Sequence, residues 1–210
     1  MNSLEKVILK TVRNLKSKWK LENVSLSNSK KEHGIDLTQV DEGELKQYLG
    51  NITNIAYLKG IGPAKDSWHQ INGLFRPLVN AGLIELAKHL PYLPGFDKNH
   101  LYRATGIKIG KNTTIAPRVQ FDYLNPELIE IGDNCIIGDG AKIWTHDYNI
   151  DSFMIGTVKI GDNVRIGSES VLFPCNIGNN VITNFGAFIY GEIPDNTKVF
   201  GREKSKYESR

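Results

Sequence analysis

The stretch IGDNCIIGDGAKI, residues 131–143, carries the pattern that decides the fold of this chain. A large aliphatic residue recurs every six positions, at Ile131, Ile137 and Ile143. Glycine follows the first two, and we expect it to allow the tight corner between neighbouring strands. The small residues Cys135 and Ala141 stand four places after the first two isoleucines. A fixed period of six residues predicts a parallel β-helix, in which each repeat supplies one short strand and one turn.

The same register continues over residues 107–200. Three hexapeptides make one triangular coil, so we expect four coils and a partial fifth strand near Val199. Stacked coils would pair strand over strand at ~4.8 Å and bury one residue of each repeat in a continuous column. The positions expected to face inward are Ile109, Ile115, Phe121, Ile131, Ile137, Ile143, Ile160, Ile166, Leu172, Ile177, Thr183 and Ile189.

Three places break the count of six, and breaks in a repeat often carry function. Four extra residues, Glu127–Glu130, separate the first two coils, and Asn149–Lys159 separates the second from the third. The last corner of the third coil, residues 174–176, is one residue short. His146 is the only histidine of the repeat region and stands just before the longest insertion.

The first twenty residues predict a basic amphipathic helix. Leu4, Ile8, Val12, Leu15 and Trp19 recur at helical spacing, and lysines and an arginine occupy the rest of the surface. One interpretation is a weak contact of residues 1–20 with an anionic membrane surface. The other is a helix whose apolar stripe packs on its own domain. We favour packing, because it explains most such stripes.

The rest of the first hundred residues predicts loops and helices. Lys20–Gly34 is polar and reads as a loop, and a short helix is expected from about Thr38 to Leu49. Ala64–Leu90 has a helical pattern that Pro77 should interrupt, and Asp97 can cap a last short helix.

The chain is therefore expected to have three parts. Residues 1-106 form a mostly α-helical N-terminal domain, residues 107-200 the β-helix, and residues 201-210 a basic tail. The fold class is mainly β.

Composition limits the possible partners and the cellular location. The net charge of +3 is too small to indicate nucleic-acid binding. Cys135 and Cys175 fall at small inward positions on different coils, which indicates two buried thiols and suits a reducing compartment. No apolar run is long enough for a membrane-spanning helix, and charges run through Met1–Lys20. We expect a cytoplasmic protein, with contact at the inner membrane face as a further option.

These repeats, with Thr145–Tyr148 (THDY) before the long insertion, resemble the hexapeptide-repeat O-acyltransferases. That group includes maltose and galactoside acetyltransferases and capsule or lipopolysaccharide O-acetyltransferases. The resemblance covers about Thr105–Gly201. It implies a left-handed β-helix, a homotrimer with acetyl-CoA bound between subunits, and a sugar, glycan or other small-molecule acceptor.

The resemblance also implies roles for residues near the long insertion. His146 would be the catalytic base, because an imidazole can take the proton of a hydroxyl as that hydroxyl attacks a thioester. The acceptor would lie near Asp122 and Tyr123 at the end of the first coil, and near Asp147. The alternatives without a function are that His146 is a solvated loop residue and that Asp122 and Tyr123 are ordinary turn residues.

The CoA path is expected along the later corners, where the chain departs from the family pattern. Arg165 replaces a usual tryptophan, and Phe185 stands in a corner that is usually made of small residues. Basic side chains here can meet CoA phosphates. The residues assigned to this path are Arg165, Ser168, Phe185, Gly186, Arg202 and Lys204.

Two other functions are known to use, or could use, this fold. A zinc enzyme of the γ-carbonic anhydrase kind shares the fold but needs three histidines from two subunits. The repeat region holds His146 alone, so no metal is expected. The second rival is a non-catalytic trimeric scaffold that has lost its CoA site.

Overall fold

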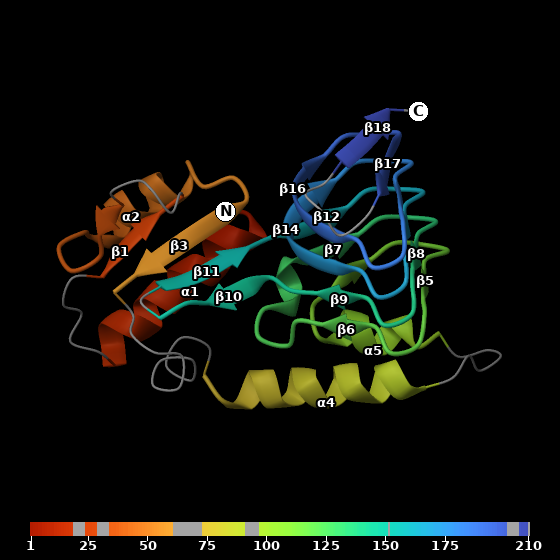
Figure 1. Ribbon diagram of the computed structural model, residues 1–210. Coiled ribbons are helices and arrows are strands. Elements are labelled where there is room, and N and C mark those ends of the chain that lie inside the picture. The colour runs from red at the N-terminus through yellow and green to blue at the C-terminus, as the bar shows by residue number, and fades with distance from the viewer. Residues whose placement is uncertain are drawn as a thin grey trace. The chain divides into compact units, whose positions relative to one another are not determined.

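The computed structural model describes residues 1–18, 24–28, 34–60, 73–90, 97–150, 152–200 and 206–209. The chain divides into two compact units (Figure 1). Unit 1 comprises Met1–Pro77 and His146–Gly156, and unit 2 comprises Leu78–Thr145 and Thr157–Arg210. Strands predominate, and those of the repeat region pair in parallel, so the predicted mainly β fold is confirmed.

Unit 2 is a stack of β-strand coils. The strands stack in the orders β4-β7-β12-β14, β5-β8-β13-β15-β17 and β6-β9-β14-β16, each pair parallel. Antiparallel β18 (Lys206–Ser209) follows β17. The parallel strands are β4 (Lys108–Ile109), β5 (Thr114–Ile115), β6 (Gln120–Phe121), β7 (Ile129–Ile131), β8 (Ile136–Ile137), β9 (Lys142–Ile143), β12 (Val158–Ile160), β13 (Arg165–Ile166), β14 (Val171–Ile177), β15 (Ile182–Thr183), β16 (Phe188–Ile193) and β17 (Thr197–Phe200).

The predicted inward column is confirmed. All twelve predicted positions are buried, and the least covered, Ile109, is 8% exposed. Identical positions of successive coils stand opposite each other, as Ile131 does with Ile109 and Ile160. Thr183 is the one polar member, and its hydroxyl accepts the Gly167 N–H at 2.9 Å. That bond satisfies a polar group that would otherwise be costly to bury.

A ladder of short polar side chains joins the coils at one corner. The third residue of each repeat there accepts a backbone N–H from the neighbouring coil. Asp133 accepts from Lys111 at 2.7 Å, and Asp162 accepts from Asp133 at 2.8 Å. Asn179 and Asp195 continue the ladder with bonds of 2.8 and 2.7 Å. Backbone donors that a tight turn leaves unpaired are thus satisfied between coils.

The glycine in second place has a different purpose from the one the repeat suggested. We expected it to allow the tight corner, but the left-handed conformation falls on the fourth residue, as at Asn134 (φ 56°) and Asn163 (φ 57°). A Cβ added to Gly138 would lie 2.5–2.7 Å from backbone atoms of Ile166, Gly167 and Ser168. The glycine is needed because the next coil passes so closely.

The three breaks in the count take different forms. The first forms the 3-10 helix η1 (Pro126–Leu128) and the start of β7, and it buries Leu128 and Ile129 completely. At the short corner, β14 continues as one strand that pairs first with β9 and then with β12, and its register against β16 shifts between Leu172 and Cys175. Most of the longest break belongs to unit 1, which includes His146–Gly156, and the chain is back in unit 2 from Thr157.

Unit 1 contains an antiparallel sheet that the sequence analysis did not predict. Its order is β10-β11-β3-β1-β2, and every neighbouring pair is antiparallel. The strands are β1 (Ser25–Ser27), β2 (Ile35–Asp36), β3 (Ile55–Lys59), β10 (His146–Tyr148) and β11 (Ser152–Gly156). Part of the expected loop Lys20–Gly34 is therefore a strand. The predicted domain boundaries stay a prediction, and the compact units divide the chain differently because β10 and β11 pair onto β3.

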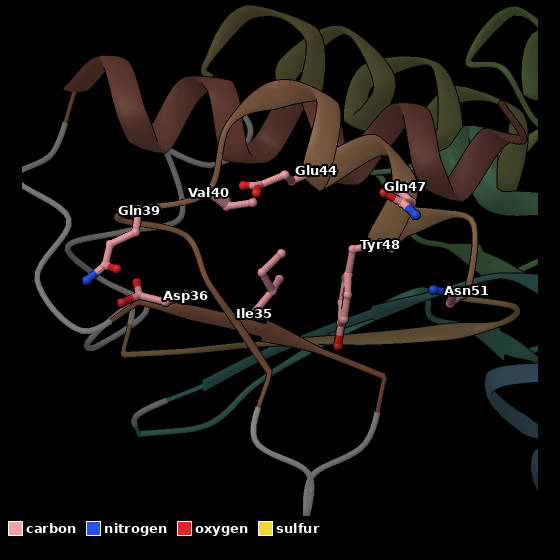
Figure 2. Close-up of a pocket in the computed structure, with 8 residues that line it drawn as sticks. All are labelled: Ile35, Asp36, Gln39, Val40, Glu44, Gln47, Tyr48 and Asn51. Atoms are coloured by element: carbon pink, nitrogen blue, oxygen red, sulfur yellow. The ribbon is translucent and has the colours of Figure 1, made fainter.

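The first helices confirm the packing interpretation. Helix α1 (Ser3–Lys18) buries Leu4, Ile8, Val12 and Leu15 to 1% exposure or less. Helix α2 (Glu42–Leu49) contacts α1, and Figures 1 and 2 show both helices on one side of the unit 1 sheet. The apolar stripe of α1 is thus covered by its own domain. Trp19 lies outside the described residues.

The start of α2 and the later helices refine the predicted boundaries. Asp41, rather than Thr38, caps α2. Helix α4 (Phe75–His89) holds Pro77 in its first turn, where a missing N–H is tolerated. The N-cap of α5 (Asn99–Ala104) is Lys98 rather than the predicted Asp97, although Asp97 accepts the Asn99 N–H at 2.9 Å just before the helix. Among the helices of the described residues, none is long and apolar enough to cross a membrane.

Replacing Gly138 by alanine tests the close approach of the coils. The new methyl group would meet backbone atoms that cannot rotate away, so Gly138→Ala should lower the free energy of unfolding by about 1–3 kcal/mol. Gly82→Ala in α4 is the matched control, because a Cβ there meets nothing within 4 Å. The control should be neutral or slightly stabilising. Urea unfolding followed by circular dichroism measures both, and equal stability of the two variants would contradict the explanation.

Candidate functional site

A groove opens on unit 2 where two stacked corners face solvent. We call it the corner groove, and its volume is about 410 Å³. One wall is β13 with the corner after it, and the other is β15 with its own corner. It brings together three of the residues predicted for the CoA path. The lining residues are Arg165, Gly167, Ser168, Ile182, Thr183, Asn184, Phe185 and Lys198.

The corner groove carries positive charge. Arg165 and Lys198 are its charged lining residues, and both are basic. Arg165 pairs with Ile182, and Ile182 pairs with Lys198, so the two cations occupy the same outward position two coils apart. Their Cα atoms are about 10 Å apart along the stack. Such a pair can contact an extended anion at two points, because each basic side chain forms charge-assisted hydrogen bonds.

The same corner places Gly186, a further predicted residue of the CoA path, next to Phe185. Phe185 is 69% exposed, a large apolar area for a single side chain. The next residue, Gly186, has φ 65° and donates its N–H to the Ser168 carbonyl at 2.8 Å. Gly186 therefore shapes the turn that presents Phe185. Arg202 and Lys204 lie outside the described residues.

Asp122 lies where it was predicted, at the end of the first coil, but it is fully buried. Its Oδ2 accepts the Thr145 backbone N–H at 2.9 Å and the Thr145 hydroxyl at 2.6 Å. Its Oδ1 accepts the Leu124 N–H at 2.8 Å. A buried carboxylate with three such donors is held firmly. This geometry favours a positioning role over the direct contact with an acceptor that the resemblance implied.

The two ends of the longest insertion are both tied into unit 2. Thr145, fully buried, is held by Asp122, as described above. At the return, the carbonyl of Thr157 accepts the Cys175 N–H at 3.0 Å. The hairpin β10–β11 therefore departs from fixed points. Tyr123, the other predicted acceptor residue of the first coil, is 40% exposed, and its carbonyl accepts the Asn80 amide at 3.0 Å.

His146 is the first residue of β10 and belongs to unit 1. It stands opposite Ile155, and its ring centroid is 5.5 Å from that of Tyr148 and 6.0 Å from that of Phe153. Since alternate residues of a strand share a face, His146 lies on the same face as the buried Phe153. It is a partly exposed strand residue packed by aromatic rings, rather than a solvated loop residue.

Asp147 faces the other way. It pairs with Met154, and strand alternation places its side chain on the opposite face of β10 from His146. Asp147 is partly exposed. Its carboxylate is therefore not aimed at the imidazole of its neighbour, although a contact with an acceptor stays a prediction.

The cysteines are buried, as expected. Cys135 and Cys175 are free thiols with 0% exposure, and burial raises the pKa of each. Neither is placed for nucleophilic chemistry, because the thiolate is the reactive form. Over the described part of the chain, no group of three histidine, cysteine or carboxylate side chains could hold a metal ion.

Two residues of this region were not predicted from the sequence. Lys198 was not singled out, although the hexapeptide register contained the signal. It precedes the inward Val199 just as Arg165 precedes Ile166, so counting outward positions would have placed both on one column. Thr145 was missed because nothing in the sequence shows that its hydroxyl meets Asp122 across 23 positions.

Comparisons with known proteins agree with this architecture. No protein-family model matches the chain. Over 145 residues the chain is 34% identical to the Bacillus subtilis protein named "Putative acetyltransferase YvoF", covering 67% of this chain and 83% of that protein. It is 38% identical over 138 residues to the Staphylococcus aureus protein named "Putative acetyltransferase SAR0816". That match covers 64% of this chain and 84% of that protein.

Solved structures share the fold. The hexapeptide-repeat containing acetyltransferase VCA0836 from Vibrio cholerae superposes with a TM-score of 0.52 at 20% identity, covering 61% of this chain and 86% of that one. A second structure of VCA0836, complexed with acetyl coenzyme A, gives the same TM-score and covers 83% of that chain. At this identity the likeness concerns the fold.

The buried network around Asp122 makes a stability prediction. An asparagine at position 122 has only one side-chain oxygen. If that oxygen accepts the Leu124 N–H, the NH₂ group faces the N–H and hydroxyl of Thr145, and the bonds that these two groups donate to Asp122 are lost. Unfolding free energy should fall by about 1.5–3 kcal/mol in urea denaturation. The matched change Asp147→Asn, on a partly exposed strand residue, should stay within about 0.5 kcal/mol of wild type. If Asp122→Asn keeps the wild-type free energy of unfolding, the network contributes little to stability.

Proposed function

We propose that this chain, which belongs to the hexapeptide-repeat acetyltransferase family, transfers an acetyl group from acetyl-CoA to a hydroxyl of a sugar or surface-glycan precursor. The observation that carries the proposal is the corner groove, where two cations and an exposed aromatic ring gather on stacked coils. A phosphate-bearing, ring-containing donor matches that lining.

Residues of the corner groove would bind the donor. Arg165 and Lys198 meet its phosphates, because both are outward and the described lining residues include no carboxylate to repel an anion. The flat ring of Phe185 offers a surface for the donor's purine, since exposed aromatic rings stack readily on flat partners. Ser168 and Gly186 hold the corner that presents that ring. Arg202 and Lys204 are proposed as further phosphate contacts.

His146 is the proposed general base. It takes the proton of the acceptor hydroxyl while that oxygen attacks the thioester carbonyl, and the proton then passes to the departing CoA sulfur. Imidazole suits this step because its charge changes near neutral pH. The rings of Tyr148 and Phe153 beside His146 restrict its orientation, which favours a defined attack geometry.

Asp122 supports the base indirectly. It fixes Thr145, and Thr145 is joined by one peptide bond to His146. The point from which the base leaves the coil is thereby held in place. Tyr123 and Asp147 are the proposed contacts to the acceptor, because both are accessible and lie next to this network in the chain.

The assembly and location follow as parts of the same proposal. We propose a homotrimer, supported by apolar side chains that unit 2 leaves on its outer faces. Ile136 is 50% exposed, Tyr190 is 49% exposed, and Phe188 contacts Tyr190 at a ring distance of 5.8 Å. Exposed apolar clusters of this kind are often covered by partners. The two free buried thiols suit a cytoplasmic location.

Removing the imidazole of His146 tests the catalytic proposal. His146→Ala should lower kcat by about 10²- to 10⁴-fold, the usual contribution of a general base, with little change in acetyl-CoA affinity. The kcat is measured with a panel of sugars as acceptors, and the CoA thiol that is released reports each transfer. His89→Ala, on an exposed residue of α4, is the control and should keep full activity. Full activity in His146→Ala would sink the mechanism.

Neutralising the corner groove tests donor binding. The double variant Arg165→Gln/Lys198→Gln should bind acetyl-CoA about tenfold more weakly, and the loss should shrink as salt is raised. Lys142→Gln is the matched control, because Lys142 also precedes an inward residue but lies outside the groove. Isothermal titration calorimetry measures all three proteins. If wild type itself shows no binding, a non-catalytic scaffold is the better description.

A further inference from the structure

A second hollow lies in unit 1, between α2 and the edge strand β2 (Figure 2). We call it the unit 1 pocket, and its volume is about 590 Å³. That volume lies in the range that holds a small organic ligand. The lining residues are Ile35, Asp36, Gln39, Val40, Glu44, Gln47, Tyr48 and Asn51.

The lining has an apolar base and a polar rim. Ile35, Val40 and the half-buried ring of Tyr48 provide apolar surface. Figure 2 shows Glu44 and Tyr48 coming from α2 and Ile35 and Asp36 from β2, on opposite sides of the hollow. The rim residues are the two carboxylates Asp36 and Glu44 and the three amides Gln39, Gln47 and Asn51, all exposed.

Both carboxylates are fixed through one oxygen. Asp36 Oδ1 accepts the N–H and the hydroxyl of Thr38, at 2.8 and 2.7 Å, and these bonds lower the pKa of Asp36. Glu44 Oε2 accepts the Asp41 N–H at 3.2 Å within the capping box of α2. The second oxygen of each has no recorded partner among the described residues. Each can therefore accept a hydrogen bond from a ligand without first being reoriented.

The three amides complete the chemistry. A side-chain amide both donates and accepts, so it can bond either lone pairs or protons of a hydroxyl. None of the three amides bonds to another side chain of the described residues. The rim thus combines fixed acceptors with adaptable donors around an apolar base.

This lining selects against anions and for hydroxyl-rich ligands. Among the described lining residues there is no lysine or arginine and there are two carboxylates, so these residues repel a phosphate-bearing molecule such as the CoA donor. A sugar ring has hydroxyls at its edge and C–H groups on its face. Carboxylates and amides match the edge, while Tyr48 and Ile35 match the face.

We propose that the unit 1 pocket binds a neutral saccharide unit, through hydroxyl bonds to Asp36, Glu44, Gln47 and Asn51 and packing on Tyr48. The pocket would hold one part of a glycan on unit 1. This inference goes beyond the transfer reaction and does not depend on it, because it rests only on the lining of unit 1 and is tested by binding.

Saturation-transfer difference NMR on the full chain tests the proposal, with maltose and N-acetylglucosamine as neutral probes and spermidine as a cationic probe. Wild type should give signals from the ring protons of a neutral sugar, and these should persist at high salt. The variant Gln47→Ala/Asn51→Ala removes two exposed amides and should weaken sugar binding about tenfold. Lys46→Ala, an exposed change on α2 outside the lining, is the matched control and should bind like wild type.

The remaining outcomes decide against the proposal. If neither sugar gives signals, or if the double variant binds as tightly as wild type, the pocket is not a saccharide site. Signals that vanish in His146→Ala but survive in Gln47→Ala/Asn51→Ala would place the sugar at the proposed acceptor site only. Binding of spermidine alone, lost at high salt, would make the pocket a cation site. Circular dichroism of each variant confirms that α2 still forms.

Discussion

The close approach of one backbone coil to the next governs unit 2. At Gly138 the neighbouring coil lies within 2.5–2.7 Å of where a Cβ would stand, so the residue type is set by contact between coils and not by the turn itself. The same spacing lets Asp133 and Asp162 accept N–H groups from the coil beside them. Because successive coils repeat this arrangement, side chains at equivalent positions are held in straight columns.

The column arrangement is what makes the corner groove possible. Arg165 and Lys198 are 33 positions apart in the sequence yet share one outward column, through Ile182 between them. Nothing but backbone pairing is needed to bring the two charges onto one wall. By contrast, Phe185 is presented by a single corner whose left-handed residue, Gly186, is bonded to Ser168. The stacked coils set the spacing between Arg165 and Lys198, and the turn at Gly186 places the aromatic ring of Phe185 beside them.

The sequence predicts this unit well and unit 1 poorly, for a physical reason. In the repeats, burial, turn and pairing all recur within six residues, so one period gives the inward column, the coils and the breaks. Strands β1 to β3 are two to five residues long, and β3 pairs with β11, which lies far along the chain. Local propensity carries little information about such pairing. The hairpin holding His146 therefore appeared from sequence only as an insertion, and the bond of Asp122 to Thr145 did not appear at all.

That bond fixes the start of the insertion that holds the proposed catalytic base. A hairpin that leaves a coil loosely would let its first residues wander, which would defeat a base that must meet a hydroxyl within hydrogen-bond reach. Here the last residue before the hairpin, Thr145, is completely buried and held by two bonds to Asp122, while Thr157 is held where the chain returns. The coils of unit 2 hold both ends of the hairpin, and between those ends β11 pairs with β3. His146 belongs to unit 1, but it is joined by one peptide bond to Thr145 of unit 2, so the position of its backbone is restricted by the repeat.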